Sequence, residues 1–202
     1  AKVKPNGTLQ WAKEYAANSI TMGYCIAEKK EGGFIIAGNT NVTSSNIDIF
    51  LMSLDANGNL LWSKTYGGAK FESVADLLQA TDGGFIVSGM TFSMGSGASD
   101  VLSFKTDNLG NLQWSRTYGG QNEDYPVKMD ITPSGIIYAG ATASFKSESF
   151  DVLLMKTDLN GNCGRLAKPA ILNTSDLNVV TKKIENASTQ KVEQGVFPPN
   201  MR

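Results

Sequence analysis

The chain has 202 residues, a formal net charge of −1 and no histidine. This charge balance, without a basic run, argues against nucleic acid as a partner, and no apolar stretch approaches the roughly 20 residues of a membrane span. Without histidine the chain lacks the commonest general base and the commonest transition-metal ligand. No nucleotide, haem or flavin signature is present, so we predict no cofactor and no metal site.

An internal repeat of about 51 residues dominates the sequence. Its clearest markers are three tryptophans at steps of 51 and 52 residues, Trp11, Trp62 and Trp114. The string Gly32–Gly38 recurs at 83–89 and, with serine replacing its first glycine, at 134–140. Many landmarks at one spacing indicate a repeat architecture, in which each unit is one supersecondary motif.

In chain order, the repeat predicts a lone strand over 8–16 and then three units over 20–66, 71–118 and 125–158. The second unit shows four strand-like runs, which we name a, b, c and d: Val74–Gln79, Phe85–Met90, Val101–Lys105 and Leu112–Thr117. A four-stranded unit cannot bury both faces alone and must stack on its neighbours. We therefore predict an all-β fold in which residues 1–162 form three four-stranded blades of a β-propeller.

The connections between strands c and d contain an aspartate followed three residues later by a glycine. The aspartates can accept backbone N–H bonds in Asx-turns, and the glycines can take positive φ. These turn residues are Asp55, Gly58, Asp107, Gly110, Asp158 and Gly161. A calcium loop is the alternative, but the later ligands and the closing glutamate of such a loop are missing.

Each tryptophan of the repeat lies on strand d. We predict that Trp11, Trp62 and Trp114 pack between successive blades. Stacking on a ligand is the alternative.

Two strings of the second unit carry a resemblance to known proteins. They are Lys105-Thr106-Asp107-x-x-Gly110-Asn111-x-x-Trp114 through Tyr118-Gly119-Gly120, and Asp82-Gly83-Gly84-Phe85 through Gly89-x-Thr91. The order of landmarks resembles the kelch blade, and the strings resemble secreted bacterial and archaeal propeller-repeat proteins over residues 4 to about 162. The resemblance implies an extracellular or cell-surface location more than an activity.

The third unit departs from this pattern. Arg165 stands where the next tryptophan is expected, so the unit lacks its own d-strand. We expect the N-terminal strand to complete it. Three blades are fewer than a closed ring needs. A second copy of the chain could supply the rest of a six-bladed ring, or further blades could belong to a longer chain.

Residues 163–202 leave the repeat and are predicted to form an extended tail. A solvated linker is one interpretation and docking on a partner is the other. Val179, Val180 and Ile184 could form a short strand, and 187–194 a weak helical turn. The two cysteines, Cys25 and Cys163, are either free thiols or one disulfide.

The b–c loops, at 41–47, 92–99 and 143–150, are the segments that differ most between the units. They share one face with the d–a links, and variable loops on a constant frame are typical of binding sites. The candidate ligand-binding residues there are Glu72, Asn122, Glu123, Asp124, Lys146 and Glu148. A cation or a sugar hydroxyl would suit them, and solvated loops are the alternative.

Three functions follow from these patterns. The first is a non-catalytic extracellular scaffold or binding module that presents its loops to a protein or glycan. The second is a structural subunit of a surface assembly that uses exposed blade edges and the tail. The third is a glycan-active lyase or hydrolase with acidic residues at the channel mouth.

Overall fold

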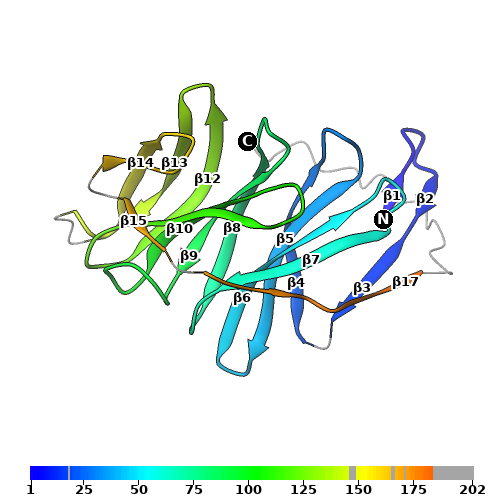
Figure 1. Ribbon diagram of the computed structural model, residues 1–202, viewed down its shortest axis with the longest axis horizontal. Coiled ribbons are helices and arrows are strands. Elements are labelled where there is room, and N and C mark those ends of the chain that lie inside the picture. Colours follow the sequence, from blue (N-terminus) through cyan, green and yellow to red (C-terminus); the bar gives the residue numbers. More distant parts are fainter. Residues whose placement is uncertain (18, 146–148, 165–166, 171, 184–202) are drawn as a thin grey trace, which may run out of the picture.

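The computed structural model describes residues 1–17, 19–145, 149–164, 167–170 and 172–183, and every element named within them is a β-strand (Figure 1). The prediction of an all-β fold is confirmed. In the part of the chain so described, no helix has the length and apolarity needed to cross a lipid bilayer.

Two antiparallel meanders of four strands form the centre of the molecule. The first contains β4 (Thr21–Glu28), β5 (Phe34–Thr43), β6 (Asn46–Leu54) and β7 (Leu60–Gly67). The second contains β8 (Glu72–Gln79), β9 (Phe85–Thr91), β10 (Asp100–Thr106) and β11 (Leu112–Tyr118). In both sheets the strand order follows the chain, so these strands correspond to a, b, c and d of the repeat.

The third sheet has three strands. They are β12 (Asp124–Thr132), β13 (Gly135–Thr142) and β14 (Asp151–Thr157). No strand of the described residues pairs with the free edge of β14. This agrees with a third unit that lacks its own strand d.

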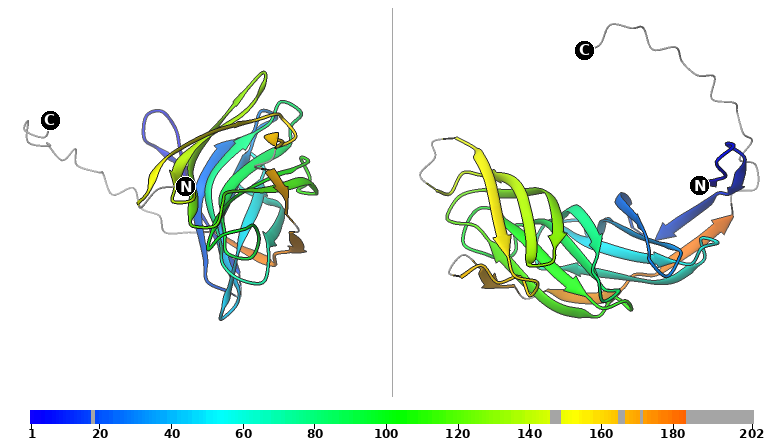
Figure 2. Two further views of the ribbon diagram at one scale, coloured as in Figure 1. Left: turned by 90° about the vertical axis from the view of Figure 1, so that its left-hand side faces the viewer. Right: turned by 90° about the horizontal axis from the view of Figure 1, so that it is seen from above.

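The N-terminal strand does not complete the third sheet, contrary to our expectation. It is divided into β2 (Leu9–Trp11) and β3 (Lys13–Ala17), and β2 pairs with the short β1 (Lys2–Val3). The sheets lie side by side along an open arc, with β3 near one end and β14 near the other (Figure 2). The two segments are therefore too far apart to pair within one chain.

The first part of the tail is not a solvated linker. It contributes β15 (Ala167–Pro169), β16 (Asn173–Asp176) and β17 (Val179–Lys183). These strands pair antiparallel with β11, β7 and β3, the strands at the outer edges of the sheets (Figure 1). We call residues 167–170 and 172–183 the strap. Ile184 and the predicted helical turn at 187–194 lie outside the described residues.

The strap crosses the sheets at regular steps. The N–H of Ala170 donates to the carbonyl of Ser115, and the N–H of Leu177 donates to the carbonyl of Ser63. An advance of seven residues along the strap therefore moves it from the second unit back to the equivalent position of the first, 52 residues earlier in the chain. Leu172, between the two crossings, is buried in the core of the first two sheets.

The hydrophobic core lies between consecutive sheets. Ile49 and Leu51 of β6 meet Phe85, Leu102 and Phe104 of the second sheet. Val101, the neighbour of Leu102 on β10, packs instead in a second cluster with residues of the third sheet. Because successive side chains of a strand point to opposite faces, a central strand covered on both sides is buried along nearly its whole length.

The c–d turns have the hydrogen bonds of Asx-turns. Oδ1 of Asp55 accepts the N–H groups of Asn57 and Asn59, each at 2.8 Å, and the turns at Asp107 and Asp158 repeat this pattern. These bonds hold the pKa of Asp55 below its ordinary value. The glycines Gly58, Gly110 and Gly161 all have positive φ.

Each tryptophan of the repeat lies against the c–d turn of the next unit. A Cβ added to Gly110 would lie 2.8 Å from the ring of Trp62, and Trp11 and Trp114 lie equally close to Gly58 and Gly161. The ring of Trp62 also packs on Phe85 of the second sheet, with centroids 6.1 Å apart. The tryptophans thus contact the neighbouring unit, where packing between blades would place them.

Candidate functional site

The b–c loops and the d–a links leave the same end of the sheets, as expected for successive meanders. They are joined by backbone hydrogen bonds: the N–H of Phe92 donates to the carbonyl of Phe71 at 3.0 Å, and that of Ala143 to Glu123 at 2.8 Å. We call residues 92–99, 119–123, 143–145 and 149–150 the loop face. The loop at 92–99 is rich in serine and glycine.

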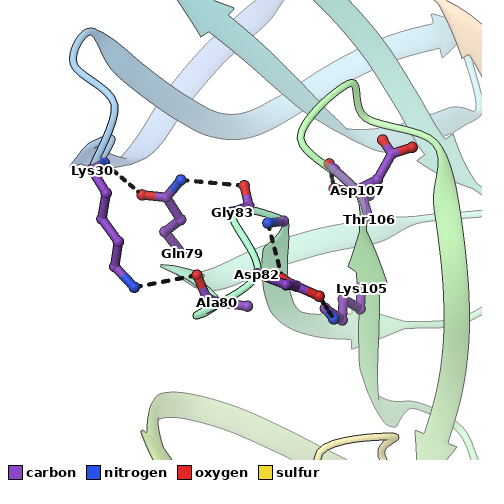
Figure 3. A network of polar contacts seen from close by, with 9 residues as sticks. Lys30, Gln79, Ala80, Asp82, Gly83, Lys105, Thr106 and Asp107 are labelled. Atoms are coloured by element: carbon purple, nitrogen blue, oxygen red, sulfur yellow. Dashed lines mark hydrogen bonds and ion pairs between the residues drawn. The ribbon is translucent and has the colours of Figure 1, made fainter.

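The opposite end of the sheets carries the a–b and c–d turns, and its polar groups bind one another. The N–H of Lys30 donates to Oε1 of Gln79, whose amide donates to the carbonyl of Gly83 (Figure 3). Lys105 forms an ion pair with Asp82 in the same turn region. The bond from Lys30 to Gln79 joins the first unit to the second, whereas the contacts of Gly83 and Asp82 lie within the second unit.

Glu72, a predicted ligand-binding residue, has a structural position. It is the first residue of β8 and is fully buried. Oε1 accepts from the hydroxyl of Thr91 at 2.7 Å, and Oε2 accepts from the N–H of Gly68 at 2.8 Å. The carboxylate therefore fastens the d–a link to strand b.

Asp124 has the same role at the next junction. It is fully buried at the start of β12. It accepts from the hydroxyl of Thr142 and from the N–H of Gly120, the latter at 2.9 Å, and Ser144 donates a further hydrogen bond at 2.6 Å. Thr91 and Thr142 occupy equivalent positions of the repeat. An acid at the start of strand a and a threonine at the end of strand b are thus one recurring pair.

Gly119 lies between two buried carboxylates. A Cβ added to it would lie 2.3 Å from Oδ1 of Asp100 and 2.5 Å from Oδ2 of Asp124. Oδ2 of Asp100 accepts the N–H groups of Ser96 and Gly97 from the b–c loop. The double glycines after Tyr66 and Tyr118 therefore make room for an acidic pair.

Asp48 is the first-unit equivalent of Asp100, but its surroundings differ. The loop between β5 and β6 is shorter than loop 92–99. Oδ1 of Asp48 is buried with no hydrogen-bond partner, as is Oδ1 of Asn46. Burial and the nearby charge of Glu72 raise the pKa of Asp48 to about 6.

The remaining predicted site residues are more accessible or lie outside the described residues. Asn122 is exposed and bonds the third b–c loop, through its amide to the carbonyl of Ala143 at 2.8 Å. Glu123 is partly exposed beside it. Lys146 and Glu148 lie outside the described residues. The structure thus separates Asn122 and Glu123, at the surface, from Glu72 and Asp124, in the interior.

Exposed aromatic rings were not predicted as site residues. Phe92, Phe145 and Phe150 stand on the loop face with a third to a half of their surface exposed. Phe92 packs edge-on against Phe71, and Phe150 packs on Tyr125. The sequence does contain a signal for these rings, because all three lie in the variable b–c loops, just after strand b or just before strand c.

Neither cysteine forms a disulfide. Cys25 lies on β4, and Cys163 follows the third c–d turn. Burial raises the pKa of both thiols. Among the described residues, no group of three or more His, Cys, Asp or Glu side chains is placed to hold a metal ion.

No family model matches the chain. It is 25% identical over 146 residues to the regulatory protein FlaEY of Caulobacter vibrioides, an alignment that covers 64% of this chain and 14% of that protein. The chain therefore spans about one seventh of the length of this relative.

Proposed function

We propose that the chain is a non-catalytic binding module of β-propeller type, with kelch-like four-stranded blades, that presents its loop face to a protein or glycan partner outside the cell. The meander order, the stacking of successive sheets and the tryptophan contacts between units support the propeller arrangement. The extracellular or cell-surface location follows from the resemblance of the repeat.

The observation that supports a binding role is the contrast between the strands and c–d turns, which are alike in the units, and the b–c loops, which are not. The turns and d-strand contacts recur from unit to unit, whereas the b–c loops differ in length and sequence. The exposed rings of Phe145 and Phe150 lie in one of these loops. Aromatic rings among serines are typical of protein-binding surfaces, so the composition of this loop favours a protein over a glycan.

The buried acids favour binding over catalysis. Glycoside hydrolysis needs two carboxyl groups that reach the scissile bond. Glu72 and Asp124 are fully buried and accept hydrogen bonds from the frame. A lyase or hydrolase would have to use other groups.

The relative adds little about mechanism. It is called a regulatory protein, and this chain aligns with only 14% of it. We propose that the two share a repeat, and that any regulatory role lies in what the repeat binds.

The test is an array experiment on the full chain. Labelled native protein is applied to printed glycans and to purified cell-surface proteins, beside the variant Phe145→Ser/Phe150→Ser. The matched control is Leu109→Ser/Leu159→Ser, because these exposed leucines lie at the opposite end of the sheets. We expect the first variant to lose at least tenfold in signal at native targets and the control to keep it.

Two results would contradict the proposal. Equal loss in both variants, or no bound target on either array, would remove the loop face as a binding site. Turnover of a printed glycan would show that the module is catalytic.

A further inference from the structure

The third sheet has a vacant position at its edge. In the first two sheets the c-strand pairs with β7 or β11, but β14 has no such partner among the described residues. A groove of about 640 Å³ runs beside β14, lined by Leu153, Leu154, Met155, Tyr118 and Cys163. It lies where the repeat places strand d.

The N-terminal end of the arc has the complementary vacancy. One edge of β3 pairs with β17, and the other edge, over Lys13–Ala17, has no partner in the part of the chain that the structure describes. The segment Leu9-Gln10-Trp11 through Tyr15 has the same pattern as Leu112-Gln113-Trp114 through Tyr118. It therefore corresponds to strand d of the repeat, but over Lys13–Ala17 no described strand c pairs with it as β10 pairs with β11.

The sheet faces at the two ends are also unpartnered. Val101 is 0% exposed in the second sheet, whereas Val152 at the same repeat position of the third is 85% exposed. At the other end, Ile26 of β4 is 68% exposed, whereas Leu77 at its position in β8 is 4% exposed. Positions that stacking buries inside the array remain apolar and uncovered at its ends.

We propose that the occupant of the β14 groove is the strand Lys13–Ala17 of a second copy of this chain. The copy would pair this strand antiparallel to β14, while its Trp11 and Tyr15 stay on its own turn at Gly58. Val152 and Leu154 would then lie against the uncovered face of the copy's first sheet. The third sheet lacks a strand d and the N-terminal strand lacks a strand c, so each end of the arc can pair with the other. The contact between two copies would then have the same strand pairing and sheet stacking as the contacts between sheets within one chain.

The repeat fixes the register of this pairing. In the second sheet Ser103 pairs with Arg116 and Val101 with Tyr118. The equivalent pairs between copies are Leu154 with Lys13 and Val152 with Tyr15. Two such junctions would join two copies into one ring of six sheets, within the roughly 4–8 blades that propellers use.

The first test is a disulfide between copies. In a background with Cys25→Ala and Cys163→Ala, chains carrying Leu154→Cys are mixed with chains carrying Lys13→Cys and oxidised. We expect a covalent pair of the two chains. The control replaces Lys13→Cys by Gln10→Cys, an exposed site on the same segment. Gln10 is three residues, or about 10 Å, out of register with Leu154, which is beyond the reach of a disulfide.

The second test is the solution mass of the native chain by light scattering, which we expect to be twice the chain mass. Val152→Lys/Leu154→Lys should be monomeric and still fold cooperatively, because both side chains are exposed in the single chain. A monomeric native chain, or equal cross-linking in the matched and control mixtures, would overturn the proposal. Open-ended assemblies with matched cross-links would support the strand pairing and overturn the two-copy ring.

This inference rests on the propeller-type stacking of the proposed function, but it does not depend on a partner that binds the loop face. A loop face that binds nothing would leave the matched cross-link intact. A failed cross-link would leave binding to Phe145 and Phe150 intact.

Discussion

The hydroxyl of Tyr66 in the first sheet donates a hydrogen bond of 2.7 Å to the carbonyl of Gly110 in the c–d turn of the second. The same bond, at the same length, joins Tyr15 to Gly58 and Tyr118 to Gly161. Together with the tryptophan four residues earlier, the tyrosine holds the turn glycine of the next unit. This contact sets the position of each unit on its predecessor.

Removing one such hydroxyl should weaken the whole array. Tyr66→Phe leaves the carbonyl of Gly110 buried without its donor, and we expect the free energy of unfolding to fall by about 1–2 kcal/mol. Tyr15→Phe should cost less, because Tyr15 is only partly buried. Urea unfolding of both variants checks this, and an equal or larger loss for Tyr15→Phe would contradict it.

The turn glycine should tolerate no side chain. Gly110→Ala combines positive φ with a Cβ that meets the Trp62 ring, and we expect a loss of more than about 2 kcal/mol. Gly83→Ala is the control, since Gly83 also has positive φ but has open space around its Cα. It should lose only about 1 kcal/mol, from backbone strain. Equal losses in the two variants would show that the ring contact contributes nothing.

Asp48 should make stability depend on pH. Its folded-state pKa of about 6 lies above the ordinary 3.8, so between about pH 4 and 6 the folded chain keeps a proton that the unfolded chain has released. The stabilisation by this proton is complete below pH 4. It is lost as the pH rises through 6, which lowers the free energy of unfolding by up to about 3 kcal/mol. Asp48→Asn cannot ionise and should therefore be more stable than the native chain at pH 7 and equal to it at pH 4.

Urea unfolding of native and Asp48→Asn protein from pH 4 to 7 measures this difference. Asp55→Asn is the opposite control, because hydrogen bonds lower the pKa of Asp55. Its loss of stability relative to the native chain should be present at pH 7 and should disappear on acidification. A native-minus-variant difference for Asp48 that does not change with pH would contradict the prediction.

The strap should contribute through its apolar side chains. Leu172 is buried between the first two sheets, and Leu172→Ala should lower the free energy of unfolding by about 2–3 kcal/mol. Val180, on the same strap, is largely exposed, so Val180→Ala should cost less than about 0.5 kcal/mol. If both variants unfold with the native midpoint, the strap does not stabilise the sheets.

Much of the sheet structure could be predicted from the sequence, because the repeat aligns each strand with two others. The run predicted at Val101–Lys105 is β10, Asp100–Thr106, and the run at Leu112–Thr117 is β11, Leu112–Tyr118. The ends shifted because pairing continues one residue past the apolar pattern. Turn residues such as Asp107 and Gly110 could be read directly, since Asx-turns and positive φ are local properties.

The short strand expected at Val179 and Val180 is part of β17, but the partners of the strap and the burial of the acids could not be predicted. The strap is short and polar. Its strands form only because the outer edges of β7 and β11 offer unpaired backbone groups, and these lie more than 100 residues earlier in the chain for β7 and about 50 for β11. Glu72 and Asp124 look like surface acids in a loop, since nothing local shows that Thr91 and Thr142 will donate to them. Both features depend on contacts that are distant in sequence.

The strap also has a consequence for the order in which the chain is made. Each sheet can form and stack as soon as its own strands have been synthesised, but the bond between Ser63 and Leu177 joins residues 114 positions apart. The outer edges of the first two sheets therefore stay open on the growing chain until residues 167–176 have been translated. Open edges are where chains pair wrongly, so the first two sheets are exposed to wrong pairing from their own synthesis until the strap emerges and covers them.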